Sequence, residues 1–129
     1  MTGRIHRFEA LENFRDYGDY GTAAGRRLAR GRLFRSAHQA RVSEADLERL
    51  AGLGIATVVD LRRPGERREQ PSRRPRDWAG QVIESVHDDE GDAPHITFLK
   101  TSDLTVESAR GFMSRVYRQL PFEPPHLDL

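Results

Sequence analysis

The sequence contains no cysteine and only one lysine, Lys100. Without cysteine, the 129 residues form no disulfide, no thiolate metal site and no thiol nucleophile. The positive charge is carried almost entirely by arginine, whose planar fork suits carboxylates and phosphates. An arginine-rich proteome would give the same bias, so this composition alone does not indicate a phosphate ligand.

Long apolar runs are also missing. The first residues, MTGRIHRFEALENF, contain no apolar stretch of the kind that a signal peptide needs. No run approaches the roughly 20 residues of a membrane span. The net charge is +1, which gives no global attraction to nucleic acid or anionic membrane. We therefore expect a cytoplasmic protein with no membrane span and no nucleic-acid partner.

Two helices are predicted from their caps and their apolar faces. Ser43 and Asp46 form a capping-box pattern between Val42 and Leu47, which occupy the hydrophobic-staple positions, and Gly54 is placed to end this helix. A second helix is expected over residues 105–120, where apolar residues recur at three- and four-residue steps. Thr105 caps it, Pro121 stops it, and Pro124 with Pro125 resembles the first turn of another helix.

A short apolar run at residues 55–61, IATVVDL, predicts a strand that is buried on both faces, as in a parallel sheet. Because a helix and a glycine precede it, the order is that of half a βαβ unit and the expected fold class is α/β. The other segments are assigned as a glycine-rich turn region at 13–31, a short strand at 32–36, a loop with three prolines at 62–77, an edge strand at 81–86 and a loop at 87–95.

Three ordered segments carry a family resemblance. They are Asn13-Phe14-Arg15-Asp16 followed by glycine, Gly31-Arg32-Leu33-Phe34-Arg35-Ser36, and Val58-Val59-Asp60-Leu61-Arg62-Arg63 with Glu66. Their order resembles the NFRDxGG, GRxxRS and DLRxxxE pattern of the bacterial tyrosine-phosphatase family of the secreted mycobacterial phosphatase B type. Asp19 departs from the pattern, because it stands where the family has a second glycine. Aspartate tolerates the left-handed backbone better than most residues, so the turn is expected to survive.

The resemblance implies a phosphoric monoester hydrolase that works through a cysteinyl-phosphate intermediate. The family's catalytic loop, HCxxGKDRTG, is absent from this sequence. We therefore expect residues 1–129 to be the N-terminal part of one tyrosine-phosphatase-like domain, catalytically incompetent alone. The expected fold is a partial phosphatase-type parallel sheet flanked by helices, without the central catalytic strand and phosphate loop. The implied substrates are phosphorylated proteins or phospholipids, and no metal or organic cofactor is implied.

By the same resemblance, eight residues lie on the substrate side of the site or brace it: Asn13, Arg15, Asp16, Arg35, Ser36, Asp60, Arg62 and Glu66. None of them is a catalytic nucleophile. The alternative is that Arg15, Asp16, Asp60 and Arg62 form a buried ion-pair network that never touches substrate. Of the neighbouring apolar residues, Phe14, Leu33 and Phe34 are expected in the core.

Two further clusters carry weaker signals. The arginines of the 62–77 segment are interrupted by acidic residues and lack interleaved aromatic residues, which favours a solvated loop over a phosphate or nucleic-acid site. His87, Asp88, Asp89 and His95 lack a regular frame that would fix metal geometry, which favours a polar loop.

A second function class stays open. The chain could be a non-catalytic paralogue that binds a phosphate ligand or a protein. If the strand that normally neighbours residues 55–61 is absent, then Ile55, Val58, Val59 and Leu61 lie on an unpaired apolar edge, and self-association through that edge is expected.

Overall fold

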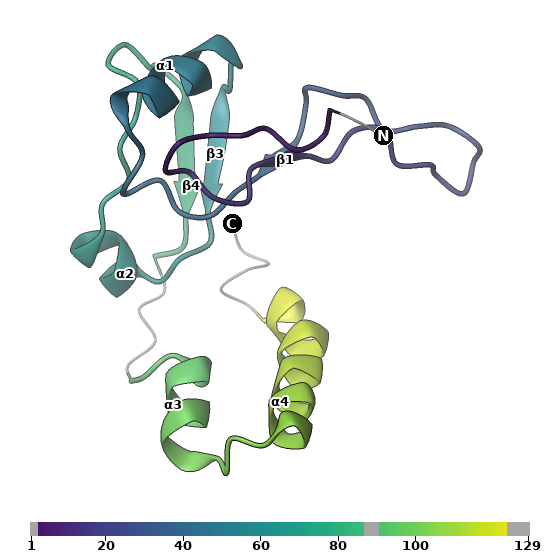
Figure 1. Cartoon of the computed structure of the whole chain (residues 1–129), viewed down its shortest axis with the longest axis vertical. Coiled ribbons are helices and arrows are strands. Elements are labelled where there is room, and N and C mark those ends of the chain that lie inside the picture. Colours follow the sequence, from purple (N-terminus) through teal and green to yellow (C-terminus); the bar gives the residue numbers. More distant parts are fainter. Residues whose placement is uncertain (1–2, 87–90, 124–129) are drawn as a thin grey trace. The chain divides into compact units, whose positions relative to one another are not determined.

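The computed structural model describes residues 3–86 and 91–123 (Figure 1). The helix expected to begin at Pro124 and part of the loop expected at 87–95 lie outside the described residues. The elements, in chain order, are β1 (Arg15–Asp16), β2 (Phe34–Arg35), α1 (Glu44–Gly52), β3 (Thr57–Asp60), α2 (Pro64–Glu69), β4 (Gln81–Glu84), α3 (Pro94–Thr101), α4 (Val106–Gln119) and the 3-10 turn η1 (Leu120–Phe122). The expected α/β class is confirmed, with small sheets flanked by helices.

The chain divides into two compact units. The first comprises Met1–Val58 and Arg67–Val82, and the second comprises Val59–Glu66 and Ile83–Leu129. That the whole chain is part of one domain stays a prediction.

The first unit contains the hydrophobic core. Its buried members are Leu11, Phe14, Val42, Leu47 and Leu50, and the half-buried Phe8, Phe34, Leu53 and Ile55 pack against them. Burial of apolar surface is the main stabilising contribution to a fold, so this cluster holds the first unit together. The core positions expected for Phe14 and Phe34 are confirmed, whereas Leu33 is exposed and its predicted place in the core is wrong.

Helix α1 begins and ends as its sequence predicts. The Ser43 side chain accepts a hydrogen bond from the Asp46 backbone, and the Asp46 side chain accepts one from the Ser43 backbone. The capping box is therefore closed in both directions. Beyond the helix, Gly54 has a φ of 62°, the left-handed conformation that glycine adopts without steric cost.

β1 and β2 form an antiparallel ladder that pairs Arg15 with Arg35 and Asp16 with Phe34. The predicted strand at 32–36 is shorter than expected, since only Phe34–Arg35 is strand. Between the two strands the chain forms a long hairpin (Figure 1). Asp19 has a φ of 71° there, so it occupies the left-handed turn position expected of it.

β3 and β4 are neighbours in a second two-stranded sheet and run in the same direction (Figure 1). The predicted burial of β3 on both faces is wrong, because exposed and half-buried residues alternate along it. Val59 is 50% exposed and the following Leu61 is 63% exposed. In the described part of the chain β3 has only β4 as a strand neighbour, and one of its faces is left uncovered.

The segment expected to be a loop at 62–77 contains α2, and the loop expected at 87–95 runs into α3. Both helices begin with a proline, Pro64 and Pro94. Proline lacks an N–H and has a fixed φ, so it fits the first position of a helix, where the N–H has no intrahelical partner. Because proline is also frequent in loops, its presence was misleading at both places.

The second unit carries α3, α4 and η1. Thr105 caps α4 by accepting a hydrogen bond from the Ser108 backbone at 3.1 Å, as predicted. The rings of Phe98 and Phe112 stack with centroids 4.5 Å apart. No residue of α3 or α4 is buried. No helix in residues 3–86 and 91–123 has the length and apolar character to cross a membrane.

Candidate active-site scaffold

Asp60 and Arg62 form a close ion pair at the carboxyl end of β3. Arg62 Nη2 lies 2.7 Å from Asp60 Oδ2, and Arg62 Nε lies 2.9 Å from Asp60 Oδ1. The Arg62 backbone N–H also donates to Asp60 Oδ1 at 3.1 Å. The Arg62 side chain is only 16% exposed and the Asp60 side chain only 11%, so the pair is partly shielded from water. Of the ion-pair network considered as the alternative for Arg15, Asp16, Asp60 and Arg62, the structure shows this pair.

The hydrogen bond to Asp60 raises the pKa of Arg62 above its ordinary value, although partial burial opposes this. The charge of Glu66 acts in the same direction as Asp60. The Glu66 carboxylate also accepts a hydrogen bond from the Arg63 backbone at 3.0 Å, next to the first residue of α2. Glu66 therefore connects the start of α2 with the turn that carries Arg62.

Asp16 connects two of the three signature segments. Its Oδ1 accepts a hydrogen bond from the Gly18 backbone at 2.7 Å, and its Oδ2 accepts one from the Gly31 backbone at 2.8 Å. Burial by itself raises the pKa of Asp16, but the N–H groups of Gly31 and Gly18 outweigh it. The result is a pKa below the ordinary value. A buried carboxylate thus joins the NFRD segment to the beginning of GRLFRS.

The remaining signature residues make local contacts. Arg15 Nη1 donates to Asn13 Oδ1 at 2.8 Å, and the Ser36 hydroxyl donates to the Ala37 carbonyl at 2.8 Å. Arg35 lies directly opposite Arg15 in the β1–β2 ladder.

The structure thus shows two groups of predicted site residues. Asn13, Arg15, Asp16, Arg35 and Ser36 lie in the first unit, and Asp60, Arg62 and Glu66 lie in the second. The ion-pair network considered for Arg15, Asp16, Asp60 and Arg62 is not what the described residues show. Arg15 bonds to Asn13 and Asp16 to backbone N–H groups, and only Asp60 and Arg62 pair with each other. Contact of these residues with substrate stays a prediction. In the described residues these side chains make local hydrogen bonds and the Asp60–Arg62 ion pair, and the sequence contains no cysteine.

Metal-ligating residues do not converge in the described residues, where no three histidine, aspartate or glutamate side chains are grouped to hold an ion. His95 is an exposed residue of α3. His87, Asp88 and Asp89 lie outside the described residues.

Asp46 makes more hydrogen bonds than its place in the capping box predicted. It was predicted as a capping residue, but its carboxylate also accepts hydrogen bonds from the backbones of Glu9, Ala10 and Leu11 at 2.7, 2.9 and 3.0 Å. Its side chain is almost fully buried. Burial raises the pKa of the Asp46 carboxyl, but hydrogen bonds from the surrounding N–H groups, first those of Ala10 and Glu9, lower it by a larger amount. The net shift of the pKa is therefore downward. No local sequence signal reveals a contact between residues more than 30 positions apart.

Two arginines of the 62–77 segment also have structural partners. Arg73 donates to the Val42 carbonyl and pairs with Glu44, and Arg74 donates to the Gln39 side chain. These contacts attach the segment to the start of α1. They indicate a structural role for this part of the arginine cluster.

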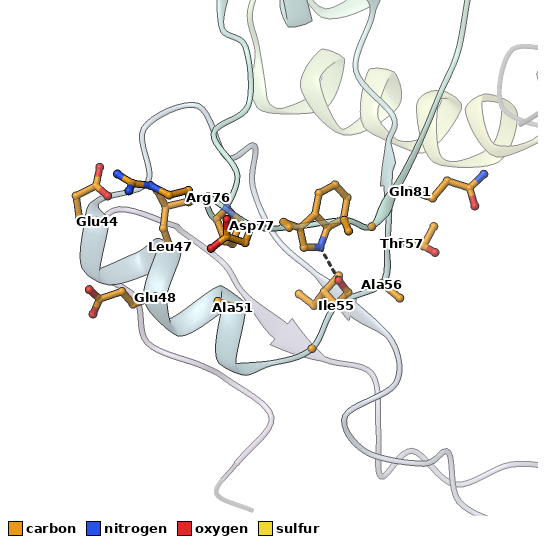
Figure 2. Close-up of a pocket in the computed structure, with 15 residues that line it drawn as sticks. Glu44, Leu47, Glu48, Ala51, Ile55, Ala56, Thr57, Arg76, Asp77 and Gln81 are labelled. Carbon is orange, nitrogen blue, oxygen red and sulfur yellow. Dashed lines mark hydrogen bonds between the residues drawn. The ribbon is translucent and has the colours of Figure 1, made fainter.

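A groove of about 790 Å³ lies between α1 and the segment that leads into β4 (Figure 2). Trp78 is fixed there because its indole N–H donates to the Ile55 carbonyl at 2.6 Å. Three carboxylates, those of Glu44, Glu48 and Asp77, line the groove, while Arg76 is its lone basic residue. The groove adjoins the first residue of β3 rather than the Asp60 end. Its net negative charge makes it a poor site for a phosphate group.

Comparison with known proteins agrees with the motifs. Residues 6–126 match the tyrosine phosphatase family. The chain is 34% identical to the "Triple specificity protein phosphatase PtpB" of Mycobacterium tuberculosis, in an alignment that covers 84% of this chain and 45% of that protein. Over 60 residues it is 52% identical to a "Putative tyrosine-protein phosphatase" of Cupriavidus necator, which covers 46% of this chain and 22% of that protein.

The chain therefore spans less than half the length of these two relatives. The family match, by contrast, covers nearly all of the chain and includes the three signature segments. By this match, the chain belongs to the tyrosine phosphatase family.

Proposed function

We propose that the chain is the amino-terminal part of a phosphoric monoester hydrolase that works through a cysteinyl-phosphate intermediate, and that it is not catalytic by itself. The observation that carries the proposal is a family match over residues 6–126 in a sequence without cysteine. In the reaction, a thiolate displaces the alcohol from phosphorus, and water then releases phosphate and restores the thiolate. No side chain of this sequence supplies that thiolate.

In this proposal the signature residues support a phosphate loop supplied by further sequence. Asp60 and Arg62 fix the turn at the carboxyl end of β3, the end at which ligands bind in open α/β sheets. Asp16 fixes the turn that follows Arg15, and Glu66 fixes the start of α2. Because the charges of Asp60 and Arg62 are already paired with each other, positioning suits them better than substrate contact.

The first test is an assay of the purified chain with p-nitrophenyl phosphate and with a phosphotyrosine peptide. We expect no turnover above the buffer background. Turnover that co-purifies with the chain and changes when a residue such as Asp60 or Arg62 is substituted would contradict the proposal. Sequencing the DNA downstream of codon 129 complements the assay, because an HCxxGKDRTG motif there would supply the missing nucleophile.

A second candidate is a non-catalytic paralogue that binds a phosphate ligand or a protein. It is favoured by one observation: the first unit closes a core of its own around Val42, Leu47 and Leu50. A unit that folds alone could serve as a binding module. A natural stop codon followed by unrelated sequence would favour this candidate over the enzyme part.

Self-association is part of the proposal. Among the described residues β3 pairs with β4 alone, so its other edge is open, and open edges template pairing with other chains. Val59 and Leu61, within and just beyond β3, are exposed and add apolar surface there. Size-exclusion chromatography over a range of concentrations tests this. A sharp monomer peak at every concentration would argue against it.

The substrate class and the location are also proposals. Phosphorylated proteins or phospholipids are the candidates for the substrate of the whole protein, and the cytoplasm is the expected compartment. Fractionation of cells that express the natural gene would test the location.

A further inference from the structure

The outer face of the β1–β2 ladder carries two arginines side by side. Arg15 and Arg35 are direct partners in the antiparallel register, which places their Cβ atoms about 4.5–5.5 Å apart on one face. Ile5 bridges to Arg15 from the other side and extends the same face. The opposite face carries Phe14 and Phe34, whose ring centroids lie 5.2 Å apart in the core.

Like charges at directly opposed positions destabilise a sheet. In residues 3–86 and 91–123 no carboxylate lies within ion-pair distance of either Arg15 or Arg35, and the contact that Arg15 makes is with the neutral Asn13. The rest of residues 3–37 also carries an excess of positive charge. Residues 3–37 contain eight arginines and four acidic residues, a formal charge of +4 in a chain whose net charge is +1.

Three of the four acidic residues of this region have partners elsewhere, and one of them is Glu9, which accepts a hydrogen bond from the Ser43 hydroxyl at 2.7 Å. Asp16 is buried on the other face and accepts its two backbone N–H groups, and Asp19 pairs with Arg27 and Arg30. The ladder therefore keeps two adjacent guanidinium groups without a neutralising partner. Two planar forks at this spacing match the several oxygens of one dianionic phosphate.

The arginine pair is flanked by aliphatic side chains. Ile5 is 77% exposed, and Leu33, two residues before Arg35 on the same face, is 61% exposed. Tyr17 lies on the same face, opposite Leu33, to which its backbone N–H donates, and it is half-buried. One half-buried ring does not make the series of stacking aromatic residues that nucleic-acid surfaces use, whereas the exposed aliphatic neighbours suit the side chains of a peptide. The face, defined here as Ile5, Arg15, Leu33 and Arg35, is called the arginine-pair face below.

We propose that the arginine-pair face binds a phosphorylated peptide segment, with the phosphate between Arg15 and Arg35 and an apolar peptide residue against Ile5 or Leu33. The choice of a phosphopeptide rests on the proposed phosphatase function. Binding at this face needs no thiolate, so it can be measured without turnover.

The test is fluorescence anisotropy of the whole chain with a labelled phosphotyrosine peptide that carries a leucine next to the phosphorylated residue. We expect the affinity to fall about tenfold in each of the single variants Arg15→Gln and Arg35→Gln. That change corresponds to the loss of one charge-assisted contact. Arg35→Lys keeps the charge but loses the fork, so its affinity should fall between those of the parent chain and Arg35→Gln. Circular dichroism of each variant shows that the fold is kept.

Arg26→Gln is the matched control, because Arg26 is an exposed arginine of the same hairpin away from the ladder. Its affinity should stay within about twofold of the parent chain, as expected for a distant surface charge. Equal binding of the unphosphorylated peptide, or unchanged affinity in both glutamine variants, would overturn the inference. So would tighter binding to single-stranded DNA or to anionic vesicles that the same variants abolish. Because binding is read without turnover, these outcomes are distinct from failure of the proposed hydrolase function.

Discussion

The two units of the chain differ in how they use their apolar residues. The first unit buries Leu11, Phe14 and Val42 and closes the cluster with a fully bonded carboxylate, that of Asp46. The second unit has two amphipathic helices without a buried residue, and Val106, Tyr117 and Phe122 are each about 70% exposed. Sequence periodicity alone does not distinguish these cases. An apolar face shows that a helix is built to pack, and only the fold shows whether something packs on it.

The largest expected effect is in the core of the first unit. Phe14→Ala should lower the free energy of unfolding by about 3–5 kcal/mol, because the ring is buried and a cavity would remain. Amide hydrogen exchange of α1, measured beside chemical denaturation, locates the loss in the first unit. Phe112→Ala is the matched control in the second unit, where the ring is only half-buried, and it should cost clearly less. Equal losses of unfolding free energy in the two variants would show that the two units do not differ in how their apolar residues stabilise them.

Asp46→Asn should cost somewhat less, about 2–3 kcal/mol, since the amide group keeps one acceptor and presents N–H groups to backbone donors. Glu48→Gln changes an exposed carboxylate on the same helix and should stay within about 0.5 kcal/mol. Urea denaturation of both variants measures the difference. If Asp46→Asn lost no more free energy of unfolding than Glu48→Gln, the hydrogen bonds from residues 9–11 would contribute little to stability.

The same carboxylates make the first unit sensitive to acid. The pKa values of Asp16 and Asp46 are lower in the folded chain than the unfolded value of about 3.9. Their stabilisation is therefore complete above the unfolded pKa and is lost as the pH falls through the folded pKa. We expect the urea midpoint to fall steeply below about pH 4, and less steeply in Asp46→Asn. Identical pH profiles for the two chains would contradict the assignment to Asp46.

In the second unit the Asp60–Arg62 pair is well shielded from water, with both side chains at most 16% exposed. Arg62→Ala should cost about 1–2 kcal/mol, because it leaves a partly buried carboxylate without its main partner. Arg118→Ala, on the exposed surface of α4, serves as the control. An unchanged denaturation midpoint in Arg62→Ala would mean that the pair does not brace the turn, and it would return Arg62 to the candidates for substrate contact.

Local signals predicted local structure well. The caps at Ser43 and Thr105 and the left-handed Gly54 are present, because each depends on residues within one helical turn. The ordered motifs also identified the family, and the Asp60–Arg62 pair follows from residues two positions apart. Nearby residues are constrained by the chain itself, so their geometry can be inferred from spacing.

The errors arose where distant residues decide the outcome. The β-branched run of β3 indicated two covered faces, but burial depends on neighbours that the run does not encode. The bonds of Asp46 come from residues on another segment, and the exposure of Leu33 depends on which face of the ladder meets the core. Pro64 and Pro94 were ambiguous for another reason, since proline occurs in loops and also at the first position of a helix.

The smallest expected effect on stability is on the exposed face of α4. Met113 is 46% exposed and Tyr117 is 70% exposed, so Met113→Gln and Tyr117→Gln should each change the free energy of unfolding by no more than about 0.5 kcal/mol. Both should lower the binding of a hydrophobic dye, because each removes apolar surface from an open face. Chemical denaturation and dye fluorescence measure the two quantities on the same samples. A loss of stability comparable with that of Phe14→Ala would show that this face is covered in solution, by a second copy or by the chain itself, and the contrast between the two units would then fail.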